Sequence, residues 1–212
     1  MDFQNVNTYS YGMWPVVVFN ILLFAFFAIS FMKPKKKIEW SSMGIFLAFL
    51  AALFAEMYGF PLTIFLLTSI IGANYPAINP FSHNSGHLTL VLLGLDQSLL
   101  ALIVLHIISS TIIFLGLYML YKGWQAIYNS KGQTLVTEGI YARVRHPQYA
   151  ALFLVTIGFL IQWPSITALF MWPILMFAYC RLAFKEEKDL LKQFGRKFME
   201  YKQRVPAFIP DF

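Results

Sequence analysis

Polar side chains that could bind or transfer small groups gather in two stretches of this 212-residue chain, residues 137–149 and 181–210. In the first, Arg145 and His146 stand directly before Pro147. Proline suits the first turn of a helix, and free N–H groups at a helix N-terminus attract anions. We therefore predict that Arg145, His146 and this helix start bind a carboxylate or a phosphate. The alternative is that they are only basic charge beside a helix start.

The second stretch contains a carboxylate on the apolar side of an expected amphipathic helix, residues 186–201. Apolar residues recur there every three or four positions, as on the buried face of a helix; they are Leu190, Leu191, Phe194, Phe198 and Tyr201. Glu187 lies on the same face, where an unpaired carboxylate would be costly. We expect its partner to be a bound cation or one of Arg143, Arg145 and Arg181. The arginine alternative would make it a structural ion pair.

The elements that must position these residues are membrane helices. The chain is 58% hydrophobic and 12% charged, against about 45–50% and about 25% in soluble domains. This composition excludes an ordinary soluble domain and intrinsic disorder. The single cysteine, Cys180, excludes an intramolecular disulfide and a CxxC redox or zinc motif.

The sequence predicts an all-α, multi-spanning membrane protein with about five transmembrane helices. A span needs roughly 20 apolar residues, and the predicted spans are residues 13–32, 42–71, 99–121, 149–163 and 165–182. The second is too long for one straight crossing and contains Glu56, Gly59 and Pro61, so we expect it to be tilted or broken. Residues 1–136 supply the first three helices, and residues 137–212 supply the hairpin and the C-terminal extension of the same domain.

The basic residues predict the orientation. All sixteen Lys and Arg residues follow the first, third or fifth span. Since Lys and Arg beside a span stay in the cytoplasm, we predict an N-terminus outside and a C-terminus in the cytoplasm. A sixth crossing would destroy this segregation. Asp2 is the only charge before the first span, and no Ala-x-Ala site follows it, so we expect an uncleaved anchor.

Both polar stretches contribute to one recognisable pattern. In order, it consists of Gly139-Ile140-Tyr141, Arg145-His146-Pro147-Gln148-Tyr149, Glu186-Glu187, Leu190, Phe194-Gly195, Tyr201, Val205-Pro206 and Ile209-Pro210. Residues 137–210 thereby resemble the isoprenylcysteine carboxyl methyltransferase family and the related phospholipid methyltransferases. Two residues depart from the family, because Ala151 replaces a usual glycine and Phe198 a frequent tyrosine. Residues 1–136 carry no family signature, and we expect them to determine the substrate.

The resemblance implies a membrane methyltransferase that uses S-adenosylmethionine without a Rossmann domain. Arg145, His146 and the helix start would hold the carboxylate of this methyl donor. Glu138 or Glu187 would balance its positive charges. Rings for stacking on adenine or for cation–π contact with the sulfonium would come from Tyr141, Tyr149 and Tyr201. The acceptor would be lipophilic, such as an isoprenylcysteine carboxylate or a similar small hydrophobic molecule, and would enter from the bilayer.

Methyl transfer from a sulfonium is an in-line displacement, so the protein mainly aligns the reactants and excludes water. Arg145 or Arg181 would hold the oxygens of a carboxylate acceptor. Glu186 or Glu187 would take the proton from a thiol or an amine acceptor. These alternatives remain open, as do two other functions: an NADPH-dependent membrane reductase of the sterol type, and a structural membrane protein whose basic tail contacts anionic lipid.

Other polar residues suggest weaker hypotheses. Glu56 is a functional candidate by default, because a carboxylate is costly within a span. His83 and His87 lie in the sequence HNSGH without an acidic or cysteine neighbour, so we predict no metal site there. We expect His106 to form a hydrogen bond between helices. The net charge of +6 is best explained by membrane lipids and orientation, and we expect no nucleic-acid partner.

Overall fold

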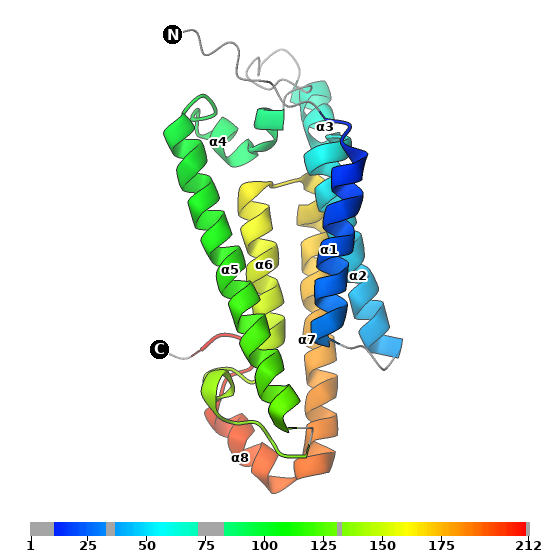
Figure 1. Ribbon diagram of the computed structural model, residues 1–212, viewed down its shortest axis with the longest axis vertical. Helices are drawn as coiled ribbons and strands as arrows, with labels where there is room; N and C mark the ends of the chain where they lie inside the picture. Colours follow the sequence, from blue (N-terminus) through cyan, green and yellow to red (C-terminus); the bar gives the residue numbers. More distant parts are fainter. Residues whose placement is uncertain (1–10, 33–36, 72–82, 131–132, 211–212) are drawn as a thin grey trace.

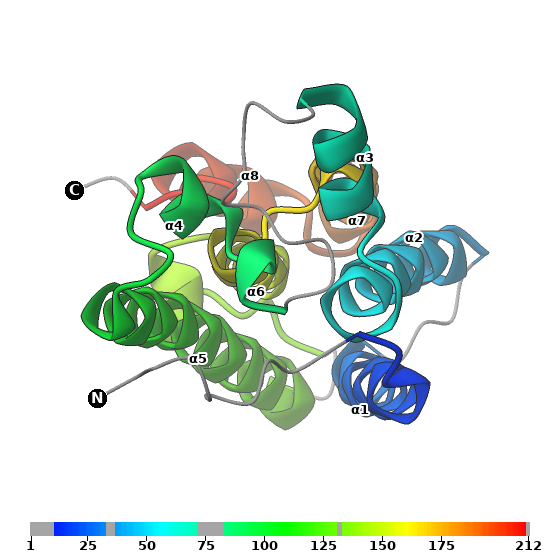
Figure 2. The same cartoon turned by 90° about the horizontal axis from the view of Figure 1, so that it is seen from above.

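The computed structural model describes residues 11–32, 37–71, 83–130 and 133–210, and all regular structure within them is helical. Apolar helices run side by side along the long axis (Figure 1); they are α1 (Trp14–Met32), α2 (Lys37–Phe54), α5 (Leu99–Ser130), α6 (Pro147–Gln162) and α7 (Ile166–Phe194). Seen from above, α6 lies at the centre, between α5 and α7 (Figure 2). The predicted all-α class is confirmed.

Three helical segments are long and apolar enough to cross a membrane: Lys37–Gly59, Leu99–Ser130 and Ile166–Phe194. Two shorter apolar helices, Trp14–Phe27 and Pro147–Gln162, lie beside them. The count of five crossings therefore stays a prediction. α5 also continues nine residues past the predicted end of its span at residue 121, because the change from apolar to polar sequence ends the lipid-facing part but not the helix.

The second predicted span is broken, as expected. α2 continues into one π-helical turn, η2 (Ala55–Gly59), and Phe60 then adopts an extended backbone. Pro61 follows, and α3 (Leu62–Ile71) begins after it, because proline cannot continue a helix interior. α3 lies at the end of the bundle that also carries η4 (His83–Gly86) and α4 (Leu88–Leu92) (Figure 1).

The helices that position the polar stretches pack closely. A Cβ at Gly116 of α5 would lie 2.8 Å from the backbone oxygen of Ala151, and one at Gly158 would lie 3.0 Å from that of Ser109. Small residues at these points let the backbones of α5 and α6 approach. On the other side of α6, the core contains fully buried residues of α2 and α7, namely Phe49, Leu50, Leu53, Leu175 and Tyr179.

The predicted hairpin end at residue 182 and the separate amphipathic helix at 186–201 were wrong. α7 runs without interruption from Ile166 to Phe194. Gly195 ends it with a φ of 53°, a region that favours glycine, and α8 (Arg196–Arg204) follows. The apolar stripe belongs to both helices, because Leu190 and Phe194 of α7 pack against Phe198, Tyr201 and Val205 across this turn.

Candidate functional site

The C-terminal tail folds back onto the residues that precede α6. The backbone N–H of Arg145 donates to the oxygen of Pro206 at 2.8 Å, and that of His146 donates to the oxygen of Ala207 at 2.9 Å. The two polar stretches therefore meet at one end of the bundle. Because α6 begins at Pro147 as predicted, the N–H groups of the two residues before it are already occupied by the tail.

Two of the predicted aromatic residues hold the same fold-back. The hydroxyl of Tyr201 in α8 donates to the backbone oxygen of Tyr141 at 2.6 Å. The hydroxyl of Tyr141 donates to the oxygen of Gly123 in α5 at 3.4 Å. Burial raises the pKa of Tyr201 to about 12, so its hydroxyl stays a donor at neutral pH. The short 3-10 helix η5 (Gly139–Ala142) is thereby fastened between α5 and α8.

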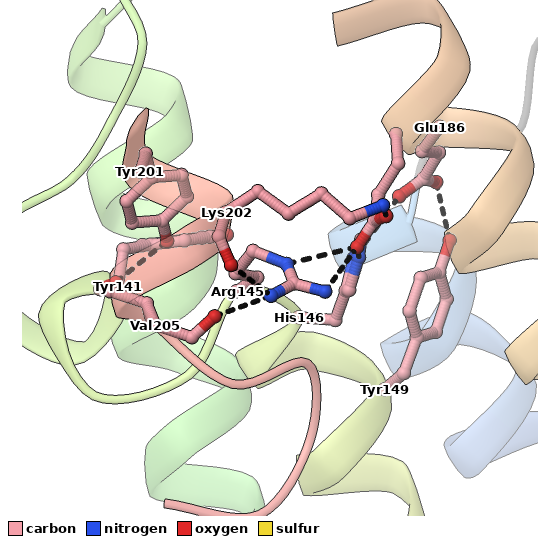
Figure 3. A network of polar contacts seen from close by, with 9 residues as sticks. Tyr141, Arg145, His146, Tyr149, Glu186, Tyr201, Lys202 and Val205 are labelled. Atoms are coloured by element: carbon pink, nitrogen blue, oxygen red, sulfur yellow. Dashed lines mark hydrogen bonds and ion pairs between the residues drawn. The ribbon is translucent and has the colours of Figure 1, made fainter. Parts of the chain in front are cut away.

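Glu187 is the centre of a network of basic side chains, and Figure 3 shows its partners Arg145, His146 and Lys202 close together. Its Oε1 accepts from Nε of Arg145 at 2.9 Å and lies 2.8 Å from Nη2. The same oxygen lies 3.1 Å from Nε2 of His146, and Oε2 accepts from Nζ of Lys202 at 2.6 Å. Glu187 is only 4% exposed. The expectation of a cationic partner is confirmed for Arg145, whereas Lys202 was not foreseen.

Arg145 also binds the tail directly. Its Nη1 donates to the backbone oxygen of Lys202 at 3.1 Å and to that of Val205. One guanidinium group therefore joins the C-terminal part of α7 to α8 and to the segment after it. This arrangement is the structural ion pair that the sequence left as one alternative.

His146 lies between two carboxylates. Besides its contact with Glu187, its Nδ1 is 3.9 Å from Oε2 of Glu186. Its side chain is 5% exposed, and this burial lowers the pKa of His146, an effect that the Glu187 carboxylate offsets only in part. The imidazole is therefore mostly neutral at pH 7.

A cavity of about 230 Å³ opens beside this network. Glu186 borders it, accepts a hydrogen bond from the Tyr149 hydroxyl and is 41% exposed. The wall comes from the end of α5, from η5 and the segment after it, from the start of α6 and from the last turns of α7. Its residues are Ile127, Tyr141, Arg145, His146, Pro147, Gln148, Tyr149, Glu186, Asp189, Leu190 and Gln193. Five of the predicted site residues are among them, and Glu187 reaches the wall through Arg145 and His146.

Besides Glu187, three predicted site residues do not line this cavity. Glu138 is exposed before η5, and its side chain does not cap that helix. Tyr201 is buried beneath η5, so it supports the wall instead of offering its ring. Arg181 lies on another face of α7, where it borders a groove with Ile38 and Phe177.

Sequence reasoning missed Gln148, Asp189 and Gln193 in the cavity wall. A signal for two of them was available. Asp189 and Gln193 follow Glu186 by three and seven residues, a spacing that puts side chains on one face of a helix. Gln148 lies within the recognised pattern, but nothing in the sequence singled it out.

The other polar residues have structural partners. His87 contacts the backbone oxygen of Gln162 through Nδ1 at 3.0 Å. The Nδ1 of His106 lies 2.9 Å from the oxygen of Leu102 in the same helix, so the predicted hydrogen bond between helices was wrong. The side chain of His83 lies outside the described residues. Within the described ranges, no group of three or more His, Cys, Asp and Glu side chains could hold a metal ion.

Comparison with known proteins matches the segment that contains every residue named above in the cavity wall. Residues 100–193 match the model of the isoprenylcysteine carboxyl methyltransferase (ICMT) family. The chain is 34% identical over 82 residues to protein-S-isoprenylcysteine O-methyltransferase of Homo sapiens. This alignment covers 38% of this chain and 29% of the human protein. It is 32% identical over 77 residues to protein-S-isoprenylcysteine O-methyltransferase B of Arabidopsis thaliana. This alignment covers 36% of this chain and 39% of the relative.

The enzyme of the same name from Schizosaccharomyces pombe is 30% identical over 82 residues, with 38% of this chain and 35% of the relative covered. The match thus spans about a third of the length of these curated relatives. Together with the long apolar helices, it identifies an integral membrane protein. The resemblance read from the sequence is confirmed, because residues 100–193 match the model of the isoprenylcysteine carboxyl methyltransferase family and the relatives carry the name of its enzymes.

Proposed function

We propose that this protein is a membrane methyltransferase that uses S-adenosylmethionine and acts on a lipophilic acceptor, with an isoprenylcysteine carboxylate as the first candidate. The observation that carries the proposal is the cavity beside Glu187, because all its wall residues lie in the segment that matches the family model. Relatives of the chain are named for this reaction. Their names favour methyl transfer over a sterol-type reductase or a purely structural membrane protein.

The cavity wall fits the groups of the methyl donor. Arg145 and His146 suit its carboxylate, and Glu186 and Asp189 suit its ammonium and sulfonium charges. The rings of Tyr141 and Tyr149 provide apolar and cation–π surface. The volume is below the roughly 300–1,000 Å³ of typical small-molecule sites, so the donor would fill the cavity and extend past its rim. When bound, it supplies an electrophilic methyl group.

The residues of the wall would differ in their roles. Glu186 is partly exposed at the rim, so we propose it as the carboxylate that contacts the donor or accepts a proton from a thiol or amine acceptor. A carboxylate acceptor needs no proton removal, and Glu186 would then serve only the donor. Glu187 and Tyr201 are positioning residues in this proposal, because they hold Arg145 and Tyr141 in place.

We further infer five crossings, with the N-terminus outside and the site at the cytoplasmic face. The support is that the start of α2, the end of α5 and α8 lie at the same end of the bundle as the site (Figure 1), and these segments carry basic residues. In a background with Cys180 replaced by alanine, a cysteine at Asp96 should react with an impermeant reagent from outside. A cysteine at Gln203 should react from inside, and labelling of both from one side would contradict this topology.

The proposed activity is tested on purified full-length protein. Calorimetry should detect binding of S-adenosylhomocysteine, the demethylated product of the donor, and radiolabelled donor should methylate N-acetyl-farnesyl-cysteine but not N-acetyl-cysteine. The Glu200→Gln variant is a control, because Glu200 is exposed and pairs only with exposed Arg196 among the ion pairs of the described residues. Binding of NADPH without binding of S-adenosylhomocysteine would contradict the proposal and favour a reductase.

A further inference from the structure

A groove on another face of α7 from the cavity has no role in the proposed methyl transfer. α2 and α7 lie side by side and pack against each other (Figures 1 and 2). Two adjoining hollows between them, of about 650 and 500 Å³, share Ile38, Phe177, Arg181 and Lys185 in their walls. They form one groove, here called the α2–α7 groove, of a size that suits a small-molecule ligand.

One part of the α2–α7 groove is apolar and open to the surroundings. Phe177 is 68% exposed and Ile174 is 47% exposed, and Ile45 of α2 faces the same hollow. These residues belong to the stretch of α7 and α2 that is free of charged side chains. Such a surface suits a hydrocarbon chain lying along the helices.

The other part of the groove is basic. Lys37 lies at the start of α2, and Arg181, Lys185 and Lys188 follow one another on α7. At about 100° per residue, the three side chains of α7 fall within about 60° of one another around the helix. All four residues are exposed. Among the residues that the structure describes, no hydrogen bond or ion pair engages their charged groups.

The nearby carboxylates do not neutralise this basic cluster. Glu39 of α2 is half-buried and does not line either hollow of the groove. Glu186 and Glu187 lie about 120° or more from Arg181 around α7, and both have partners in the network beside the cavity. Asp189 lies about 40° from Lys185 around the helix, but it borders the cavity and neither hollow of the groove. The positive charge of the groove is therefore available to a ligand.

The basic cluster lies where the sequence of α7 changes from apolar to charged. Residues 166–180 carry no Asp, Glu, Lys or Arg, and Arg181 is the first charge after them. At such a boundary a phospholipid places its phosphate, with its acyl chains toward the apolar part. Several cations around one hollow suit a phosphodiester as the ligand better than they suit a single carboxylate.

From this arrangement we propose that the α2–α7 groove binds one anionic phospholipid, with its phosphate among Lys37, Arg181 and Lys185 and an acyl chain along Ile174 and Phe177. The site is separate from the cavity beside Glu187, and the proposal does not depend on methyl transfer. The two sites have no lining residue in common.

Native mass spectrometry of the full-length protein tests this lipid site with phosphatidylglycerol and phosphatidylcholine of identical acyl chains. We expect at least tenfold greater retention of phosphatidylglycerol. The double variant Arg181→Gln, Lys185→Gln should lower this retention at least fivefold. The matched control Lys122→Gln, Lys197→Gln removes the same charge from α5 and α8 and should retain the lipid.

A second measurement locates the lipid without any substitution. A photoactivatable phosphatidylglycerol should label peptides of α2 and α7 in the unaltered protein, so the proposal remains testable if the double variant does not fold. Equal retention of both lipids, equal loss in the control variant, or labelling confined to other helices would overturn it. Displacement of the lipid by equimolar N-acetyl-farnesyl-cysteine would also overturn it, because the groove would then belong to the acceptor.

Discussion

Two carboxylates in this protein are equally buried but have different hydrogen-bond and charge partners. Glu56 and Glu187 are each 4% exposed. Glu56 accepts hydrogen bonds from the N–H of Thr63 at 2.9 Å and from the hydroxyl of Thr167, which are neutral groups. Glu187 is surrounded by three basic side chains beside a cavity. Burial of a carboxylate within an apolar sequence is therefore a weak sign of function. The kind of group that donates hydrogen bonds to the carboxylate is a stronger sign.

The neutral environment of Glu56 has a structural purpose. Thr63 lies in the first turn of α3, and its hydroxyl accepts from the N–H of Ile166, the first residue of α7, at 2.8 Å. Because the first N–H groups of a helix lack partners within it, Glu56 and Thr63 together satisfy donors of two helix starts. This explains how the chain tolerates a break after η2, and it replaces the default expectation that Glu56 is functional.

Replacing Glu187 by glutamine should have the largest effect. The change leaves Arg145 and Lys202 without their counter-charge, and breaking a buried pair on one side costs on the order of 3–5 kcal/mol. We expect the lower end of this range because Lys202 is 45% exposed. Unfolding in mixed detergent and SDS measures it, with Glu200→Gln as control. An unchanged free energy of unfolding together with lost methyl transfer would show that Glu187 serves the donor directly.

Replacing Glu56 by glutamine should cost less. The amide keeps the shape and one acceptor oxygen, but its NH₂ group faces a donor, so we expect a loss of about 1–3 kcal/mol in the free energy of unfolding. Activity per folded molecule should remain close to that of the unaltered protein. If methyl transfer instead fell more than tenfold while stability was kept, the distinction between the two carboxylates would fail.

The Glu187 cluster should also give stability a dependence on pH. Burial holds the pKa of His146 below its ordinary value of 6.5, so the unfolded chain binds a proton first as the pH falls. The contribution of His146 to the free energy of unfolding is complete above about pH 6.5. It declines below this pH by at most about 1.4 kcal/mol per pH unit. The decline should be smaller in His146→Gln. Since burial also lowers the pKa of His87, the difference between the two proteins is the quantity to measure, and equal slopes would contradict this role.

Replacing Glu186 by glutamine should change stability least. Its side chain is 41% exposed, and an amide oxygen can still accept from Tyr149, so we expect a change within about 0.5 kcal/mol. If Glu186 contacts the donor, the Kd for S-adenosylhomocysteine should rise about tenfold, which corresponds to about 1.4 kcal/mol. Calorimetry on Glu186→Gln and Glu200→Gln makes the comparison. Equal affinity in both variants would remove Glu186 from the proposed site.

Local sequence determined much of this architecture. The apolar runs predicted helices, Pro61 predicted a break, and Pro147 predicted the start of α6. Each of these features depends on whether a segment prefers lipid or water, or on the backbone of a single residue. The neighbouring sequence is therefore sufficient to predict it. The pattern around Arg145 and Glu187 likewise indicated the resemblance to the family, because the types and order of its residues are visible without a structure.

Only the tertiary structure decided which of these residues meet. Arg145 and Glu187 are 42 residues apart in sequence, and three arginines were equally plausible partners. The uninterrupted course of α7 to Phe194 sets the direction of each side chain around the helix, so Glu186 borders the cavity while Arg181 faces the α2–α7 groove. Composition cannot predict the direction in which each side chain of α7 points. This direction depends on where the helix ends and on what packs against each of its faces.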